Sequence, residues 1–110
     1  MKKFICMAIF CSSFLFANEQ NSINKGLTYY KYILKPYLGY DGLAFTKKYT
    51  QKEWEVLFDN DAKAFKELFG KESKELEAFL HSEKFTTIKA DLKSFAVYYA
   101  KDSTVSPHCE

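Results

Sequence analysis

Apolar residues recur at intervals of three and four along most of the chain, which is the spacing of one buried helix face. In the first such segment these positions are Leu27, Tyr30, Leu34, Tyr37 and Leu38. Pro36, Gly39 and Gly42 then mark a turn in the stretch PYLGYDG. The pattern predicts an N-terminal helix that ends in a glycine turn.

A capping box begins the next predicted helix, because Thr50 is followed three residues later by Glu53. The buried face of this helix would carry Trp54, Leu57 and Phe58. The triplet DND at positions 59–61 is expected to break or kink it. A further short helix would follow, with an inward face made of Ala62, Phe65, Leu68 and Phe69 and with Gly70 at its C-terminal cap.

Two more helices complete the predicted fold. Ser73 is placed to cap one whose inward residues are Leu76, Phe79 and Leu80. The last has a stripe of Ile88, Leu92, Phe95, Ala96 and Tyr99, while Lys89, Asp91, Lys93 and Lys101 face water. No useful length alternates with strand period. We predict an all-α domain over residues 18–102, built from four to five short helices around one aromatic core, and a loose tail over residues 103–110.

The first 17 residues have the three parts of a secretory signal peptide. Lys2 and Lys3 precede an apolar run from Phe4 to Phe16, and LFA then meets a polar stretch, so cleavage is expected after Ala17. The apolar run is shorter than the roughly 20 residues that span a membrane, although a retained N-terminal anchor is the alternative interpretation. We expect an exported periplasmic protein with no transmembrane segment after cleavage.

The amino-acid composition argues against one class of function, the binding of nucleic acids. Lys2 and Lys3 account for the formal charge of +2, so residues 18–110 are formally neutral, and they contain no arginine. A neutral chain without guanidinium groups lacks the electrostatic footprint of a nucleic-acid-binding protein. Seven Phe, eight Tyr and one Trp remain after cleavage, and these large side chains suit the core of a small domain.

No catalytic arrangement is evident. The two histidines, His81 and His108, are far apart in sequence, and no serine or cysteine has triad spacing. We therefore predict no enzymatic activity, no cofactor and no catalytic residue. The adjacent pair His108 and Cys109 could bind copper or zinc weakly, but two donors fall short of the four of a structural zinc site. A lone thiol near the end of the chain is the simpler interpretation.

Two features point to partners. Cys109 is the only cysteine outside the signal peptide, and an odd cysteine in an oxidising compartment predicts an intermolecular disulfide, either in a homodimer or with another protein. Tyrosines are also dense around the first helix. If Tyr30 points inward, Tyr29 and Tyr32 should be exposed, and with Tyr40 they form a candidate interaction surface. For the tyrosines as a whole, however, core packing is the role that we expect first.

The layout resembles a small c-type cytochrome, in which the first helix runs into Cys-x-x-Cys-His-Gly-x-x-Gly and the closing helix carries aromatic residues. Gly39 and Gly42 take the two glycine positions, and ADLKSFAVYYAKDS is similar to the closing helix. Leu34 and Tyr37 stand at the cysteine positions and Leu38 at the histidine position. The resemblance therefore implies a cytochrome-like scaffold without the residues that attach and ligate haem.

These observations favour an exported, haem-free helical protein that binds a partner. The alternative is an electron-transfer protein of cytochrome c-like fold that binds haem non-covalently, with His81 as the ligand.

Overall fold

The computed structural model describes residues 20–104, and these residues form a succession of helices. They are a continuous N-terminal helix over residues 20–38, which includes η1 (Tyr30–Leu34) and α2 (Lys35–Leu38), then α3 (Gly42–Thr46), α4 (Gln51–Phe69), η2 (Gly70–Glu72), α5 (Lys74–Leu80) and α6 (Glu83–Tyr98). Residues 20–104 contain no β-strand, which confirms the all-α prediction. Within this range no helix is both long and apolar enough to cross a membrane.

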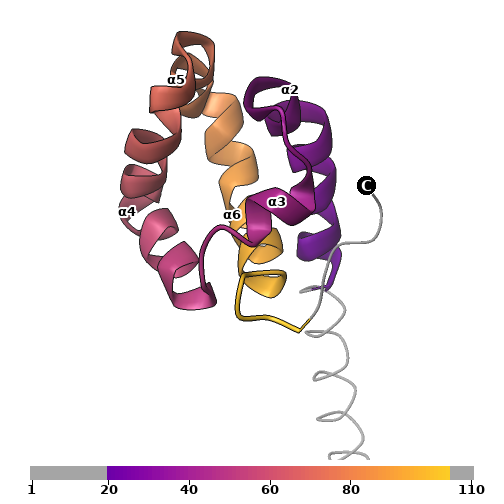
Figure 1. The fold of residues 1–110 in the computed structure, drawn as a ribbon. Helices are drawn as coiled ribbons and strands as arrows, with labels where there is room; N and C mark the ends of the chain where they lie inside the picture. Colours follow the sequence, from indigo (N-terminus) through magenta and orange to yellow (C-terminus); the bar gives the residue numbers. More distant parts are fainter. Residues whose placement is uncertain (1–19, 105–110) are drawn as a thin grey trace, which may run out of the picture.

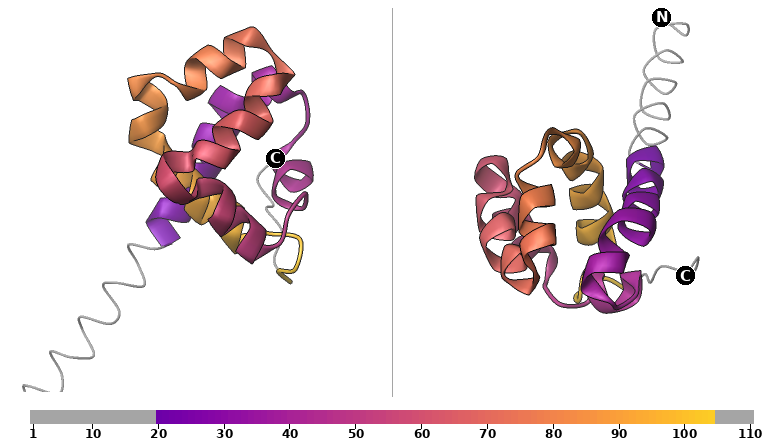
Figure 2. Two further views of the ribbon diagram at one scale, coloured as in Figure 1. Left: turned by 90° about the vertical axis from the view of Figure 1, so that its left-hand side faces the viewer. Right: turned by 90° about the horizontal axis from the view of Figure 1, so that it is seen from above.

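The closing helix α6 lies at the centre of the arrangement. In Figures 1 and 2 the N-terminal helix runs along one side of α6, and α4 and α5 lie along the other. The short helix α3 crosses α6 and joins the two sides (Figure 1). Because α6 contacts α3, α4 and α5, its apolar stripe becomes the middle of the core.

Polar caps fix where the helices begin, as predicted. The Glu53 amide donates to the Thr50 hydroxyl at 3.2 Å and the Glu53 carboxylate accepts from the Thr50 amide at 2.9 Å, which confirms the capping box. Ser73 accepts from the Leu76 amide at 3.0 Å and so begins α5. Each cap satisfies amides that have no partner within the helix.

Helix α4 is interrupted in its middle, which confirms the break expected at the DND triplet. Asp59 is extended, and Asn60, Asp61 and Ala62 all have left-handed backbone angles, with φ between 56° and 60°. The chain therefore folds back on itself. Trp54 and Phe69 have ring centroids 6.3 Å apart, whereas 15 residues of unbroken helix would span about 22 Å.

Phe45 on α3 is the hub of the aromatic core. Its ring centroid lies 4.5 Å from that of Tyr30 and 4.8 Å from that of Trp54, and it also contacts Phe69 and Phe95. Trp54 Nε1 donates to the carbonyl of buried Thr46 at 3.0 Å. The five-residue helix that carries Phe45 was not expected from the sequence, which predicted only a turn over residues 36–42, before Phe45.

The N-terminal helix packs closely against α6 at Gly26. A Cβ at this position would overlap the Asp91 carbonyl oxygen and lie 2.5 Å from the Cβ of Phe95. One turn earlier, the Ser22 hydroxyl donates to the Asp91 carboxylate at 2.6 Å. The crossing thus depends on a residue without a side chain.

Some predicted helix faces are wrong. Tyr37 and Leu68 were expected inward, but each is more than one-third exposed. Asp91 and Lys89 were expected to face water, but Asp91 accepts from Ser22 and Lys89 forms an ion pair with Asp61. The π-helical turn η1 shifts the phase of the helix that follows, which accounts for Tyr37. Leu68 lies at the edge of the buried stripe that Ala62, Phe65 and Phe69 form.

Candidate interaction surfaces

Tyr32 lies in the π-helical turn η1, which directly precedes the helical turn that contains Pro36. Pro36 has no N–H to donate to the carbonyl four residues earlier, and the Lys35 amide instead donates to the Tyr30 carbonyl, five residues back. The Tyr32 side chain is 70% exposed, and Lys31 Nζ lies 5.6 Å from the centre of its ring. A π-helical turn of this kind is frequent at functional sites.

The other two predicted surface tyrosines are less accessible. Tyr29 and Tyr40 are half-buried and pack against the core. The Tyr40 carbonyl accepts from the Tyr30 hydroxyl at 2.5 Å, and Lys48 Nζ lies 4.8 Å from the Tyr40 ring centre. Burial, followed by the charge of Glu72, raises the pKa of Tyr40 to about 12. Of the three tyrosines, Tyr32 is the one that stands clear of the core.

The exposed face around Tyr32 is basic. We call it the Tyr32 face and define it as the exposed residues Lys25, Thr28, Tyr32 and Pro36, flanked by the half-buried Lys31 and Lys35. Residues 20–40 contain three lysines and no acidic residue. Residues 67–83, which include α5, contain five glutamates and two lysines. Basic and acidic side chains are therefore concentrated in two different regions of the chain.

A second candidate surface is an apolar groove on the first half of α4. We call it the α4 groove; it encloses about 450 Å³ and is lined by Tyr49, Thr50, Lys52, Glu53, Val56 and Leu57. Trp54 and Phe58 occupy the core side of the same helix, which leaves Val56 59% exposed. Val56 is the most exposed large aliphatic side chain of the described residues. Val56 and the half-buried Tyr49 and Leu57 together form the apolar part of this surface.

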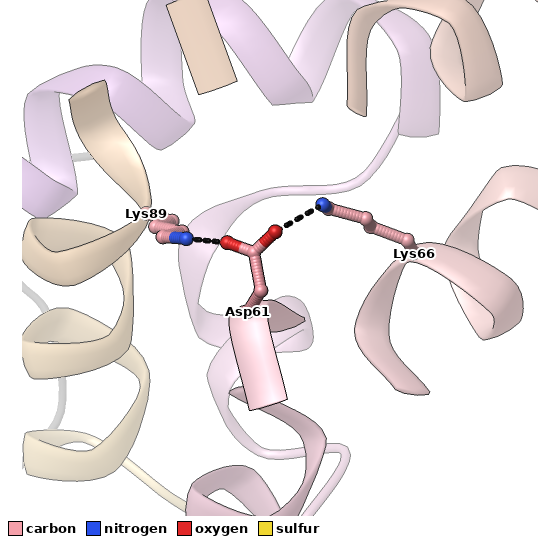
Figure 3. A network of polar contacts seen from close by, with 3 residues as sticks. All are labelled: Asp61, Lys66 and Lys89. Carbon is pink, nitrogen blue, oxygen red and sulfur yellow. Dashed lines mark hydrogen bonds and ion pairs between the residues drawn. The ribbon is translucent and has the colours of Figure 1, made fainter. Parts of the chain in front are cut away.

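A third feature is the charged cluster at the left-handed turn. Asp61 accepts from Lys66 at 3.3 Å and forms an ion pair with Lys89 of α6 (Figure 3). His81, at the end of α5, lines the same surface hollow as Asp61 and Lys66. Both ammonium groups are paired with the Asp61 carboxylate, so this cluster ties the turn to α6.

The remaining candidate residues are the two histidines, Cys109 and the residues at the positions of the cytochrome motif. His81 is exposed, and the described residues hold no group of three or more metal-ligating side chains. Leu34, which stands at one cysteine position of the cytochrome motif, is buried in the core, and Leu38 packs partly against it. Cys109 and His108 lie outside the described residues. No family model, curated protein or solved structure matches the chain.

Proposed function

We propose that this chain is an exported, haem-free helical protein of the periplasm that binds an acidic protein partner through the Tyr32 face. The observation that carries the proposal is the 70% exposure of Tyr32 on a face with lysines and no carboxylate. Tyrosine is enriched at protein interfaces because a rigid, amphipathic ring gives a large contact area. Lysines around it would steer a partner that carries carboxylates.

The core supports the haem-free part of the proposal. Rings from four helical segments fill it, with Phe45, Trp54 and Phe65 fully buried among them. His81, the histidine of the competing haem hypothesis, is exposed at the end of α5 and is not part of this buried core. An absorbance spectrum of protein from the periplasm tests this part directly. A Soret band that disappears in His81→Ala would refute it in favour of an electron-transfer role.

Export has its own test. The proposal expects the chain in the periplasmic fraction, with Asn18 as its N-terminal residue after cleavage behind Ala17. N-terminal sequencing of the fractionated protein measures both points. Recovery of the uncleaved chain in the inner membrane would instead support the retained anchor.

Partner binding is tested by photo-crosslinking in intact cells. A photoreactive amino acid replaces Tyr32 in one variant and Tyr98 in a control variant, because Tyr98 is also exposed but lies on α6. We expect one discrete adduct from position 32 and none of the same mass from position 98. Equal adducts from both positions, or none from position 32, would refute a role for this face.

Binding assays with the purified partner then measure how much each residue of the face contributes to affinity. Tyr32→Ala should weaken binding at least about tenfold, as expected for an interfacial tyrosine, and should leave folding unchanged because the ring is exposed. Lys25→Gln should instead slow association and reduce the salt dependence of binding. Thr86→Ala, on the exposed side of α6, is the matched control and should change neither value.

A further inference from the structure

We propose that the break in α4 is a hinge, and that two copies of this chain exchange their N-terminal parts when the hinge straightens into unbroken helix. The product would be a domain-swapped dimer, in which residues 20–58 of each copy pack against residues 63–104 of the other. The inference uses neither the Tyr32 face nor the α4 groove. It and the proposed function can therefore fail separately.

The hinge has a backbone conformation that its residues do not favour. Asn60, Asp61 and Ala62 follow one another with φ of 56°, 60° and 58°, and none of them is a glycine. Residues other than glycine visit the left-handed region as single residues, chiefly asparagine and aspartate, and not in succession. Ala62 has no polar side chain to stabilise such angles, and alanine is the best helix-forming residue. A right-handed helical conformation would remove this strain.

The buried residues on the two sides of the hinge keep the period of one continuous helix. They are separated by intervals of four, four, three and four positions, and they are Trp54, Phe58, Ala62, Phe65 and Phe69. In an unbroken helix all five would lie within about 80° of one another around the axis. Two helices joined by a turn would not need to share one phase in this way. The sequence of α4 therefore also fits a straight amphipathic helix of 19 residues.

The ion pairs that hold the turn in place are weak. Asp59, Asn60 and Asp61 are all exposed. The Asp61 carboxylate pairs with Lys66 and Lys89 (Figure 3), but its side chain is 64% exposed, and ion pairs in contact with water contribute little to stability. The chain is therefore kept folded back mainly by the packing of the aromatic rings on the two sides of the hinge.

A second copy of this chain is the partner that can restore this packing when the hinge straightens. The ring centroids of Trp54 and Phe69 are 6.3 Å apart in the folded-back chain, whereas a straight helix would hold the two residues about 22 Å apart. A single straightened chain would thus expose rings that are now buried, such as Phe45 and Phe65, which is unfavourable in water. Another straightened copy carries the missing half of the core, so the same contacts re-form between the two chains.

Two opposing effects set the balance between monomer and dimer. The short hinge holds the two parts of one chain at a high effective concentration, which favours the monomer. Straightening releases the left-handed strain in both copies, which favours the dimer. We therefore expect the dimer to form at high protein concentration and to respond strongly to the residue at the hinge.

The exchange would double the number of Tyr32 faces in one particle. Every residue of that face lies between Lys25 and Pro36, so each lobe of the dimer would keep a complete copy. Two faces on one particle would bind a multivalent partner more tightly than one. This consequence, unlike the exchange itself, rests on the proposed function.

Substitutions at the hinge test the exchange through the association constant of the dimer. The purified chain is kept reduced, so that no disulfide can link two copies, and is refolded at millimolar concentration. Size-exclusion chromatography with light scattering then measures monomer and dimer. Asn60→Ala should raise the association constant at least about tenfold, because alanine disfavours the left-handed angles, favours helix and acts in both copies. Asn60→Gly should lower it at least about tenfold for the converse reasons. Glu55→Ala is the matched control, because Glu55 is exposed on α4 away from the hinge, and it should leave the constant unchanged.

A second measurement identifies the rings that pack between chains. Isotope-labelled and unlabelled chains of Asn60→Ala are refolded together, and isotope-filtered NMR detects proton contacts between the two kinds of chain. Trp54 and Phe69 should give such contacts, because they lie on opposite sides of the hinge and their rings are neighbours. Trp54 and Phe45 are the control pair. Their ring centroids are 4.8 Å apart, but both precede the hinge, so their contact should stay within one chain.

Three results would overturn the inference. The first is a dimer without contacts between Trp54 of one chain and Phe69 of the other, which would be an ordinary surface dimer. The second is the same association constant for Asn60→Ala and Asn60→Gly. The third is an Asn60→Ala chain that stays monomeric after refolding at millimolar concentration. Circular dichroism confirms that each variant is folded, and wild type against Asn60→Gly gives the same comparison without the alanine variant.

Discussion

Replacing Gly26 by alanine is the most direct test of how the N-terminal helix meets α6. The change adds one methyl group. In the structure that methyl would overlap the Asp91 carbonyl oxygen and lie 2.5 Å from the Cβ of Phe95. Neither obstacle can rotate away, because one is the backbone of α6 and the other is the first carbon of a fully buried side chain.

The magnitude follows from two opposing effects. Alanine is about 1 kcal/mol better than glycine within a helix. Overpacking a rigid contact costs about 1–3 kcal/mol, and the upper end applies where backbone must move. Separating the two helices would also stretch the 2.6 Å hydrogen bond from Ser22 to Asp91. We therefore expect Gly26→Ala to lower the free energy of unfolding by about 2 kcal/mol.

Gly70→Ala is the matched control, since it makes the same chemical change without the clash. Gly70 has a φ of −64°, and a Cβ there would meet nothing nearer than the flexible Glu77 side chain at 3.4 Å. Denaturation followed by circular dichroism measures both variants. A loss of about 2 kcal/mol in a domain of this size corresponds to a fall in Tm of about 8–16 °C, whereas Gly70→Ala should equal or slightly exceed the wild type.

A Gly26→Ala variant as stable as Gly70→Ala would refute the reasoning. It would mean that position 26 behaves as an ordinary helical site, where alanine is preferred, and that the two helices do not cross at this residue. Gly26→Val extends the test, because a larger side chain at a true crossing must be worse still.

Three further predictions concern the break in α4 and the Tyr40 phenol. Because residue 60 has left-handed backbone angles, the free energy of unfolding should be highest with glycine there, lower with asparagine and lowest with alanine. Asn60→Ala should be about 1 kcal/mol less stable than the wild type. If α4 were an unbroken helix, alanine would instead be the most stable of the three. Asp61→Asn should cost less than about 1 kcal/mol, and the loss should vanish at high salt, because its ion pairs are partly exposed. Folding raises the pKa of Tyr40 to about 12, so the stability from its neutral phenol is complete below pH 10 and is lost between pH 10 and 12. Absorbance titration of wild type against Tyr40→Phe measures this last ionisation, and a Tyr40 that titrates at its ordinary pKa would contradict the packing around it.

Local signals in the sequence predicted much of the fold. The capping box at Thr50 and Glu53, the cap at Ser73 and the break at the DND triplet were all correct, because each depends on residues within four positions of one another. The inward stripe of α6 was also correct, since 16 residues of helix give a clear period.

Features that depend on distant residues were missed. The helix that carries Phe45 spans five residues and is too short to show a period. Nothing near Gly26 in the sequence indicates that Asp91 lies against it. Tyr37 was placed on the wrong face because the π turn before it changes the helix phase. The exposure of Tyr32 did follow from the inward position of Tyr30.

Ring packing in the aromatic core offsets the backbone strain of the left-handed turn. Left-handed angles at Asn60, Asp61 and Ala62 cost up to about 1–2 kcal/mol per residue. The turn brings Phe65 back to within 4.7 Å of Phe58 and 6.4 Å of Trp54, measured between ring centroids. Such pairs contribute about 0.5–1.5 kcal/mol each beyond the burial of their surface.

The strain is therefore offset only if several rings pack together at the fold-back. Phe65 meets Phe45, Phe69 and Phe85 in addition to Phe58 and Trp54, so five ring pairs depend on one side chain. Removing that ring would leave the strained turn without the packing that compensates it, and the cost should exceed that of an ordinary core phenylalanine. Because the core is filled by its own rings, a partner of different sequence would have to bind at the outer surface, as the proposal for the Tyr32 face requires.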